Sequence, residues 1–187
     1  MESREQQLID IAKPYLDSAR SGDWEHALRV VRWVKELGAG RSDLHLLTAA
    51  AYIHDIGWSG IAPKGKIDFD EMLKLEPQAA ENSSRLVTRI LHNLEYDDSD
   101  ILVINRLIAA ADKHESEKDD EEIIVDSDNL SKLCIEHLNE KYQPESFSKL
   151  FRRWDDELDG RIKTTKGREI YPKILEKLKK EASSYHK

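Results

Sequence analysis

The chain has 187 residues, which is the size of one ordinary domain and too short for a large modular protein. Charged residues make up 35% of the chain and apolar residues 39%, with only 8 Gly and 5 Pro, a composition that favours helices and argues against an all-β barrel or sandwich. The net charge of −8 argues against a protein that binds long nucleic acids, because such proteins carry a basic surface. The N-terminus lacks an apolar signal segment and no apolar run is long enough to span a membrane, so we expect a cytoplasmic protein.

The N-terminal third predicts three helices. Ser3 is placed to cap the first helix, and Pro14 is expected to bend or split it. The second helix is expected to run from Asp23, its cap, to Leu37. Residues 43–56 are almost continuously apolar, so the third helix is expected to be central and buried on most sides.

The rest of the chain predicts one long loop and several more helices. Residues 57–68 contain three of the eight glycines and form the expected loop. Further helices are expected at about 69–75, from Pro77 onward, at 100–114, from the acidic stretch 115–122 to about Glu140, at 145–157 and at 166–184. The pattern predicts an all-α fold, a single compact domain over residues 1–187 with about seven or eight helices.

Two histidines and two aspartates stand out because they interrupt apolar helix faces. His54 and Asp55 lie in the last turn of the most apolar helix, His26 points inward from another helix, and Asp128 interrupts an apolar run. Two imidazoles and two carboxylates suit a metal site with nitrogen and oxygen ligands. A buried His–Asp hydrogen-bonded pair without metal fits the same spacing, and neighbouring residues on a helix diverge by about 100°. Periodicity alone therefore leaves both interpretations open.

The same residues resemble the H…HD…D signature of the HD-domain superfamily of metal-dependent phosphohydrolases. The resemblance includes the surroundings of the ligands: residues 24–30 (WEHALRV), 50–57 (AAYIHDIG) and 122–130 (EIIVDSDNL) resemble the family's three ordered motifs. It covers about residues 20–140, and the helices within 145–184 are expected to pack on this core.

The resemblance implies an all-α domain in which His26, His54, Asp55 and Asp128 bind one divalent transition metal ion. Nitrogen ligands favour Mn²⁺, Fe²⁺, Co²⁺, Ni²⁺ or Zn²⁺ over Mg²⁺, which prefers oxygen. Such an ion polarises a phosphoryl oxygen and activates water for attack on phosphorus. The expected activity is hydrolysis of a phosphomonoester or phosphodiester in a small phosphorylated metabolite or nucleotide.

His114 resembles a histidine that some relatives carry ahead of the last motif. We expect it to contact the phosphate or to support the metal ligands, with Asp55 as the other catalytic side chain. Glu81 and His92 are further candidates for a second ion, but the chain lacks the paired histidines of members that bind two metals. A site for one ion is therefore expected.

Phosphate binding also needs cations. Arg29 lies three residues after His26 on the same helix face, so we expect it to be catalytic and to bind substrate. Lys64 and Lys66 lie on the glycine-rich loop, which could act as a lid, and Lys113 lies beside the expected catalytic histidine.

Two alternative functions stay open at this point. A sensor or interaction domain with the same fold could bind a nucleotide or a metal ion without turnover. A structural helical domain could use the histidines and aspartates only as buried hydrogen-bonded pairs. The complete set of four candidate ligands argues against the sensor, because a pure binding module would not need all four.

Overall fold

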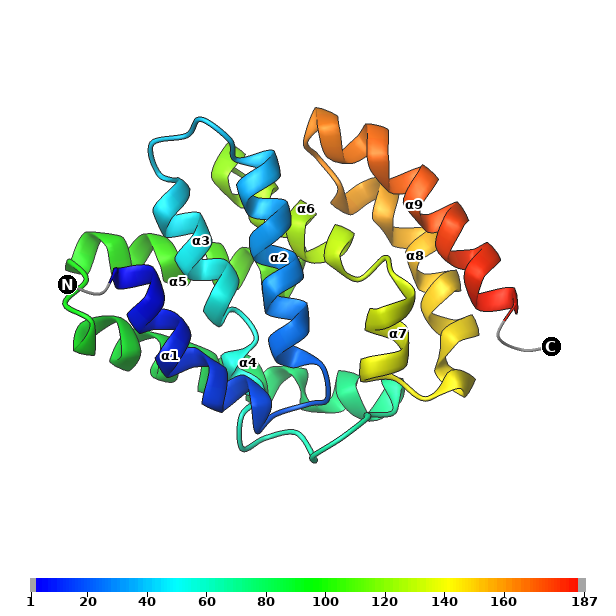
Figure 1. Cartoon of the computed structure of the whole chain (residues 1–187), viewed down its shortest axis with the longest axis horizontal. Coiled ribbons are helices and arrows are strands. Elements are labelled where there is room, and N and C mark those ends of the chain that lie inside the picture. Colours follow the sequence, from blue (N-terminus) through cyan, green and yellow to red (C-terminus); the bar gives the residue numbers. More distant parts are fainter. Residues whose placement is uncertain (1–2, 185–187) are drawn as a thin grey trace.

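Nine α-helices and two short 3-10 turns make up the described part of the chain, residues 3–184, in the computed structural model (Figure 1). The elements are α1 (Arg4–Asp17), α2 (Asp23–Leu37), α3 (Leu44–Ile53), η1 (Ile56–Trp58), α4 (Phe69–Asn93), α5 (Asp98–Lys113), α6 (Asp119–Ser131), α7 (Ile135–Lys141), η2 (Pro144–Ser146), α8 (Phe147–Arg161) and α9 (Thr165–Ser184). Residues 3–184 contain no strand, which confirms the predicted all-α fold, and His186 lies outside them. Within these residues, no helix combines the length and apolar character needed to cross a membrane.

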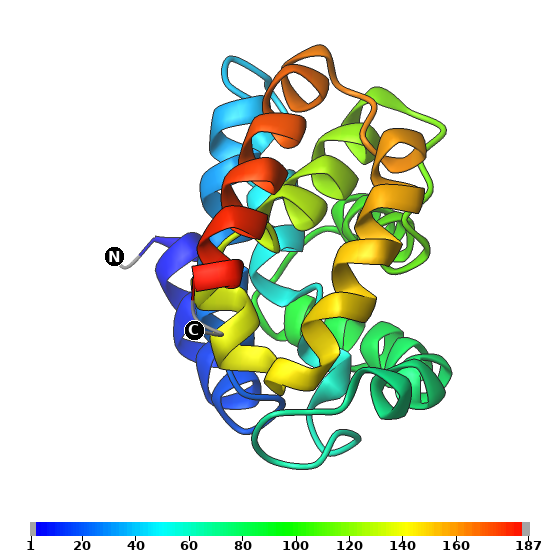
Figure 2. The ribbon, with the colours of Figure 1, turned by 90° about the vertical axis from the view of Figure 1, so that its right-hand side faces the viewer.

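Helix α2 lies at the centre of the domain and packs against α3 on one side and α6 on the other (Figure 1). Helix α5 closes the back of α3 and α6, and α1 covers α2 and α3. The C-terminal helices α8 and α9 both contact α6, on the side away from α1 (Figure 2). Helix α6, which carries Asp128, therefore contacts the preceding helices α2, α3 and α5 as well as the C-terminal helices α8 and α9.

The core consists of two apolar clusters that meet at the candidate site. One cluster contains the buried apolar side chains of α1, α2, α3, α5, the second half of α4 and the start of α6, and the other contains those of the first half of α4, α7, α8 and α9. The chain passes from the first cluster to the second between Leu16 and Ala19, between Ile56 and Trp58, and between Val125 and Leu130. The HD pair and Asp128 lie at or beside the last two of these crossings, so the polar site is placed at the junction of the clusters.

Several helix boundaries differ from the predicted ones. Pro77 was expected to begin a helix, but it lies inside the continuous helix α4, whose two halves both bury apolar side chains. The helix expected to reach Glu140 breaks after Ser131. The Ser131 hydroxyl donates to the carbonyl oxygen of Asp128, an acceptor that a continuing helix would use for a backbone N–H group. Residues 3–184 contain nine α-helices, against the predicted seven or eight, and the joining at Pro77 and the break after Ser131 offset each other in this count.

The predicted cap of α2 is also wrong. The residue at the cap position is Gly22, with a φ of 74°, and the predicted cap Asp23 is the first residue of the helix. Asp23 is 1% exposed and takes part in a buried ion-pair network described below. A left-handed glycine at this position lets the chain enter α2 with Asp23 turned inward.

Gly57, directly after the HD pair, brings η1 into very close contact with α4. A Cβ atom at this position would lie 2.2 Å from the Ala79 carbonyl oxygen and 2.7 Å from the Ser83 Cβ. Asn82 of α4 donates from Nδ2 to the carbonyl oxygens of Gly57 at 2.8 Å and Ser59 at 3.1 Å. The absence of a side chain at Gly57 thus allows α4 to fix the segment that follows His54 and Asp55.

Candidate metal centre

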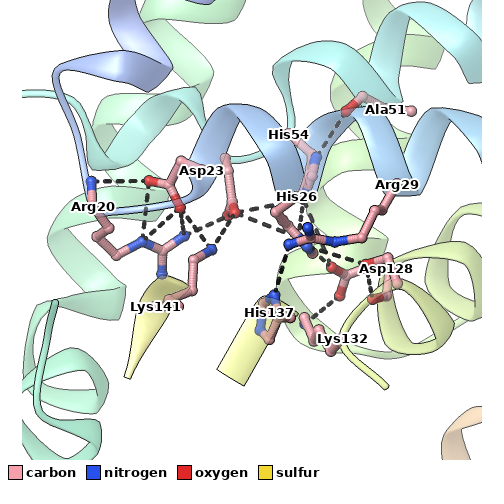
Figure 3. A network of polar contacts seen from close by, with 12 residues as sticks. Arg20, Asp23, His26, Arg29, Ala51, His54, Asp128, Lys132, His137 and Lys141 are labelled. Atoms are coloured by element: carbon pink, nitrogen blue, oxygen red, sulfur yellow. Dashed lines mark hydrogen bonds and ion pairs between the residues drawn. The ribbon is translucent and has the colours of Figure 1, made fainter. Parts of the chain in front are cut away.

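Three of the predicted ligands come together from three different helices. His26 lies in the second turn of α2, His54 caps the C-terminal end of α3, and Asp128 lies near the end of α6. All three are buried, and one ligand atom from each lies within 4.8 Å of those of the other two (Figure 3). The His26 Nε2 atom is 3.1 Å from His54 Nε2 and 3.2 Å from Asp128 Oδ1. This His-His-Asp group could hold a metal ion.

The fourth predicted ligand, Asp55, lies directly beside this group. Its Oδ2 atom is 3.6 Å from His26 Nε2 and 3.7 Å from His54 Nε2, and His54 Nε2 is 3.7 Å from Asp128 Oδ1. An ion about 2.1 Å from each ligand holds neighbouring ligand atoms about 3.0 Å apart in an octahedron and about 3.4 Å apart in a tetrahedron. The separations of 3.1–3.7 Å among His26, His54 and Asp128 therefore suit one shared ion, and Asp55 lies beside this group of three.

Hydrogen bonds behind the two imidazoles indicate which ring nitrogens carry protons. His54 Nδ1 is 2.9 Å from the carbonyl oxygen of Ala51, which can only accept, so Nδ1 must donate. His26 Nδ1 is 3.1 Å from Ser131 Oγ, and that hydroxyl already donates to the carbonyl of Asp128 at 2.7 Å. When this hydroxyl donates to the carbonyl it can accept from His26 Nδ1, which places the proton of this ring on Nδ1, as in His54.

This tautomer leaves the Nε2 atoms of His26 and His54 with lone pairs that face each other. Burial, and next the ammonium of Lys141, keep the pKa of His26 well below its usual range, so its ring carries only the Nδ1 proton near pH 7. Two facing lone pairs 3.1 Å apart repel each other unless a cation lies between them. Metal-ligating histidines are oriented in this way, with the second nitrogen donating to a carbonyl or hydroxyl oxygen. In this tautomer both buried imidazoles present Nε2 to one point, as metal ligands do.

Asp55 is held by a buried ion-pair network. Arg20 Nη2 lies 2.8 Å and Lys141 Nζ 3.4 Å from Asp55 Oδ2. Both cations also contact Asp23 Oδ1, Arg20 Nη2 at 3.1 Å and Lys141 Nζ at 2.6 Å (Figure 3). The guanidinium of Arg20 also stacks on Trp58, 3.8 Å from the ring centroid. Burial alone would raise the pKa of Asp55, but Arg20 and Lys141 hold it well below its usual range. The carboxylate is therefore ionised and fixed.

The second carboxylate oxygen of Asp128, Oδ2, contacts residues outside the ligand group. Lys132 Nζ is 2.5 Å and His114 Nδ1 is 3.6 Å from Asp128 Oδ2. Burial would raise the pKa of Asp128, but Lys132 and His26 hold it well below its usual range. Burial, and next the charge of Lys132, lower the pKa of His114 to about 3, so this imidazole is neutral at pH 7.

A cavity of about 390 Å³ opens onto the ligand group. Its charged and polar lining includes Arg20, His54, Asp55, Asp112, Lys113, His114, Asp128, Lys132, His137, Lys141, Arg153 and Arg161. Its apolar lining includes Trp58, Phe69, Met72, Pro77, Ala79, Leu150 and Trp154. Dehydration in the cavity, and next the Asp55 carboxylate, raise the pKa of Asp112 to about 7. The cavity is large enough for a small organic phosphate and presents cations on the walls around the ligand group.

Only part of the predicted phosphate-binding set lies at this cavity. Lys113 and His114 line it, but Arg29, Lys64 and Lys66 are absent from its lining among the described residues. Lys64 and Lys66 are exposed on the glycine-rich loop, and Arg29 borders a second cavity and bonds to Glu140. The geometry thus separates these three predicted side chains from the metal group.

The candidates for a second ion also lie elsewhere. Glu81 is exposed on α4 and outside the cavity lining, and the side chain of His92 is 54% exposed, 4.0 Å from Asp98. Neither residue is near the ligand group, which agrees with the choice of His26, His54 and Asp128 as the centre of the site.

Sequence reasoning missed most of the cations that line the cavity. Arg20 and Lys141 are buried and both contact Asp55, which is distant from them in the chain, and the sequence carries no signal for these contacts. For Arg153 and Arg161 the sequence does carry a signal, because they lie two turns apart on the amphipathic helix α8. Glu157, midway between them, accepts from Arg153 Nε at 2.8 Å and pairs with Arg161. One carboxylate thus holds both arginines at the cavity.

In comparisons with known proteins, neither a family model, nor a curated protein, nor a solved structure matches the chain. Residues 3–184 form an all-helical domain with a buried His-His-Asp group that could bind a metal ion. This arrangement is compatible with an HD-type metal site.

Proposed function

We propose that the chain is a metal-dependent phosphohydrolase of HD type that acts on a small phosphorylated metabolite or nucleotide. The observation that supports this proposal is the convergence of the Nε2 atoms of His26 and His54 with the carboxylates of Asp55 and Asp128, at a cavity rich in cations.

The donor set indicates the kind of ion. Two imidazole nitrogens and two carboxylate oxygens favour one Mn²⁺, Fe²⁺, Co²⁺, Ni²⁺ or Zn²⁺ ion over Mg²⁺. When bound, such an ion supplies a Lewis acid for a phosphoryl oxygen and activates water for in-line attack on phosphorus. His26, His54, Asp55 and Asp128 would hold it, with Ser131 and the Ala51 carbonyl orienting the two imidazoles.

The remaining side chains of the cavity would bind and orient the substrate. Lys113, Arg153 and Arg161 line the cavity and would attract the phosphate, with the two arginines held by Glu157. His114 is neutral at pH 7, so it can hydrogen-bond to a phosphate oxygen without repelling the nearby cations. The apolar wall formed by residues of η1, α4 and α8 would exclude water and contact the organic part of the substrate.

The proposal is tested with the full chain loaded with Mn²⁺ or Zn²⁺ and a panel of phosphomonoesters, cyclic nucleotides and nucleoside triphosphates. We expect turnover of at least one class, and its loss in Asp128→Asn. The matched control is Asp70→Asn, which removes a carboxylate exposed on α4. Absence of turnover across the panel would overturn the proposal, and binding without product release over hours would favour a sensor domain instead.

A further inference from the structure

His137 is a buried histidine at the cavity that the proposed mechanism leaves unused. It lies in α7, it is 1% exposed and it lines the same cavity as the metal group. Its ring centroid lies 5.1 Å from that of His26 and 5.8 Å from that of Tyr142. The ring is therefore fixed between a candidate metal ligand and an aromatic side chain.

The protonation of His137 follows from its neighbour Arg29. Arg29 Nη2 lies 3.5 Å from His137 Nδ1, and a guanidinium can only donate, so Nδ1 is the acceptor. The same Nη2 atom donates to Glu140 Oε2 at 2.8 Å, which holds the guanidinium in place. An imidazole whose Nδ1 accepts a hydrogen bond carries its proton on Nε2.

The Nε2–H group of His137 has no hydrogen-bond partner among the residues that the structure describes, although it is fully buried. A buried donor without a partner is costly, so such a group normally has a partner in the functional state. The cavity that His137 lines is also lined by Lys113, Arg153 and Arg161. A buried donor at a cavity with such cations suits an anionic oxygen of a bound molecule.

We propose that His137 is a further ligand-binding residue, which donates from Nε2 to an anionic oxygen of the molecule held in the cavity. In this account Arg29 and Glu140 are positioning residues: they fix the tautomer of His137 from behind and do not touch the ligand. The proposal rests on the proposed function only in taking the phosphoryl group as the source of that oxygen. It assigns Arg29 a role that differs from the direct phosphate contact expected from the sequence.

The tautomer is tested by NMR on full-length protein labelled with ¹⁵N at histidine, without metal and after loading with diamagnetic Zn²⁺. Comparison with His137→Gln assigns the His137 signals. We expect a protonated Nε2 and an unprotonated Nδ1, and a shift of the Nε2–H signal when inorganic phosphate is added. A proton on Nδ1, or an Nε2–H signal that phosphate does not move, would overturn the proposal.

Two matched substitutions separate hydrogen bonding from packing. In His137→Gln the amide nitrogen can reach the position of Nε2 and donate, whereas in His137→Asn the shorter amide reaches only the position of Nδ1. We expect the Kd for inorganic phosphate, measured by calorimetry, to rise about 10- to 100-fold in the Asn variant and by less than about 3-fold in the Gln variant. Equal losses in both variants would indicate a structural role and contradict the proposal.

Arg29→Met tests the positioning role. We expect the His137 proton to distribute over both ring nitrogens and phosphate binding to weaken, with the metal content unchanged. An unchanged tautomer would contradict the role of Arg29. Phosphate binding through His137 without turnover of any substrate would support this inference and refute the proposed phosphohydrolase. Turnover of a substrate without a response of the His137 signals would support the phosphohydrolase and refute this inference.

Discussion

Replacing Gly57 by alanine perturbs the segment that connects the HD pair to α4. The added Cβ would lie 2.2 Å from the Ala79 carbonyl oxygen, where an ordinary contact needs more than 3 Å, so α4 and η1 must separate by about 1 Å. The atom that it meets belongs to the backbone of a helix, which cannot turn aside as a flexible side chain would. The substitution therefore strains the packing of two elements at once.

The structure allows the cost to be worked out. Overpacking of this kind costs about 1–3 kcal/mol. Separating η1 from α4 also stretches the two hydrogen bonds from Asn82 to the carbonyl oxygens of Gly57 and Ser59, each worth about 1 kcal/mol. We therefore expect Gly57→Ala to lower the free energy of unfolding by about 3–5 kcal/mol. For a domain of this size, that corresponds to a fall in Tm of about 6–20 °C.

The control is Gly160→Ala. Gly160 lies in α8, and a Cβ there would have no neighbour within 4 Å among the described residues. Alanine should stabilise this helix by about 0.4–1 kcal/mol, so the two substitutions are expected to act in opposite directions. Urea unfolding followed by circular dichroism measures both. A Gly57→Ala protein as stable as the wild type would refute the claimed close packing of η1 and α4.

Three further predictions concern buried polar groups. Lys141→Met should lower the free energy of unfolding by about 3 kcal/mol, because it leaves Asp23 and Asp55 with only Arg20 as a cation, whereas Lys149→Met, at an exposed pair, should leave the urea midpoint unchanged. Asp126→Ala should cost about 2–4 kcal/mol, because the Asp126 carboxylate accepts two backbone N–H groups and one hydroxyl from residues 163–164; an unchanged melting temperature would contradict this reasoning. The pKa of buried His137 lies below that of the unfolded chain, so the unfolded state binds the extra proton and stability falls as the pH drops below about 6.5. Between pH 6 and 5, His137→Gln should therefore lose about 1 kcal/mol less stability than the wild type, and parallel pH profiles would count against the neutral buried ring.

The sequence predicts the helices better than their joins. Apolar periodicity locates α2, α3, α5, α8 and α9 within a few residues, because each buries one face in the core. Pro77 misleads because a proline at the start of a helix and a proline inside one look alike in sequence, and here packing on both sides keeps α4 continuous. The break after Ser131 depends on a side-chain hydrogen bond that periodicity does not detect.

The site is predictable where it depends on interrupted apolar faces. His26, His54 and Asp128 each disturb such a face, and the structure brings them together. The cations are harder to predict, because many surface positions tolerate a lysine or arginine and only tertiary contacts distinguish a buried one. Arg29 shares a helix face with His26, yet Glu140 from α7 draws its guanidinium away from the cavity, a contact across 111 residues.

The central claim is that His26, His54, Asp55 and Asp128 hold a metal ion. Its most direct test is the metal content of the purified protein, measured by mass spectrometry after loading with Mn²⁺ or Zn²⁺ and removal of free ion. The account predicts about one ion per chain in the wild type and in His92→Gln, whose side chain is exposed, and almost none in His54→Gln with its helicity retained. A wild-type protein without bound metal, or a His54→Gln protein with the wild-type metal content, would contradict it.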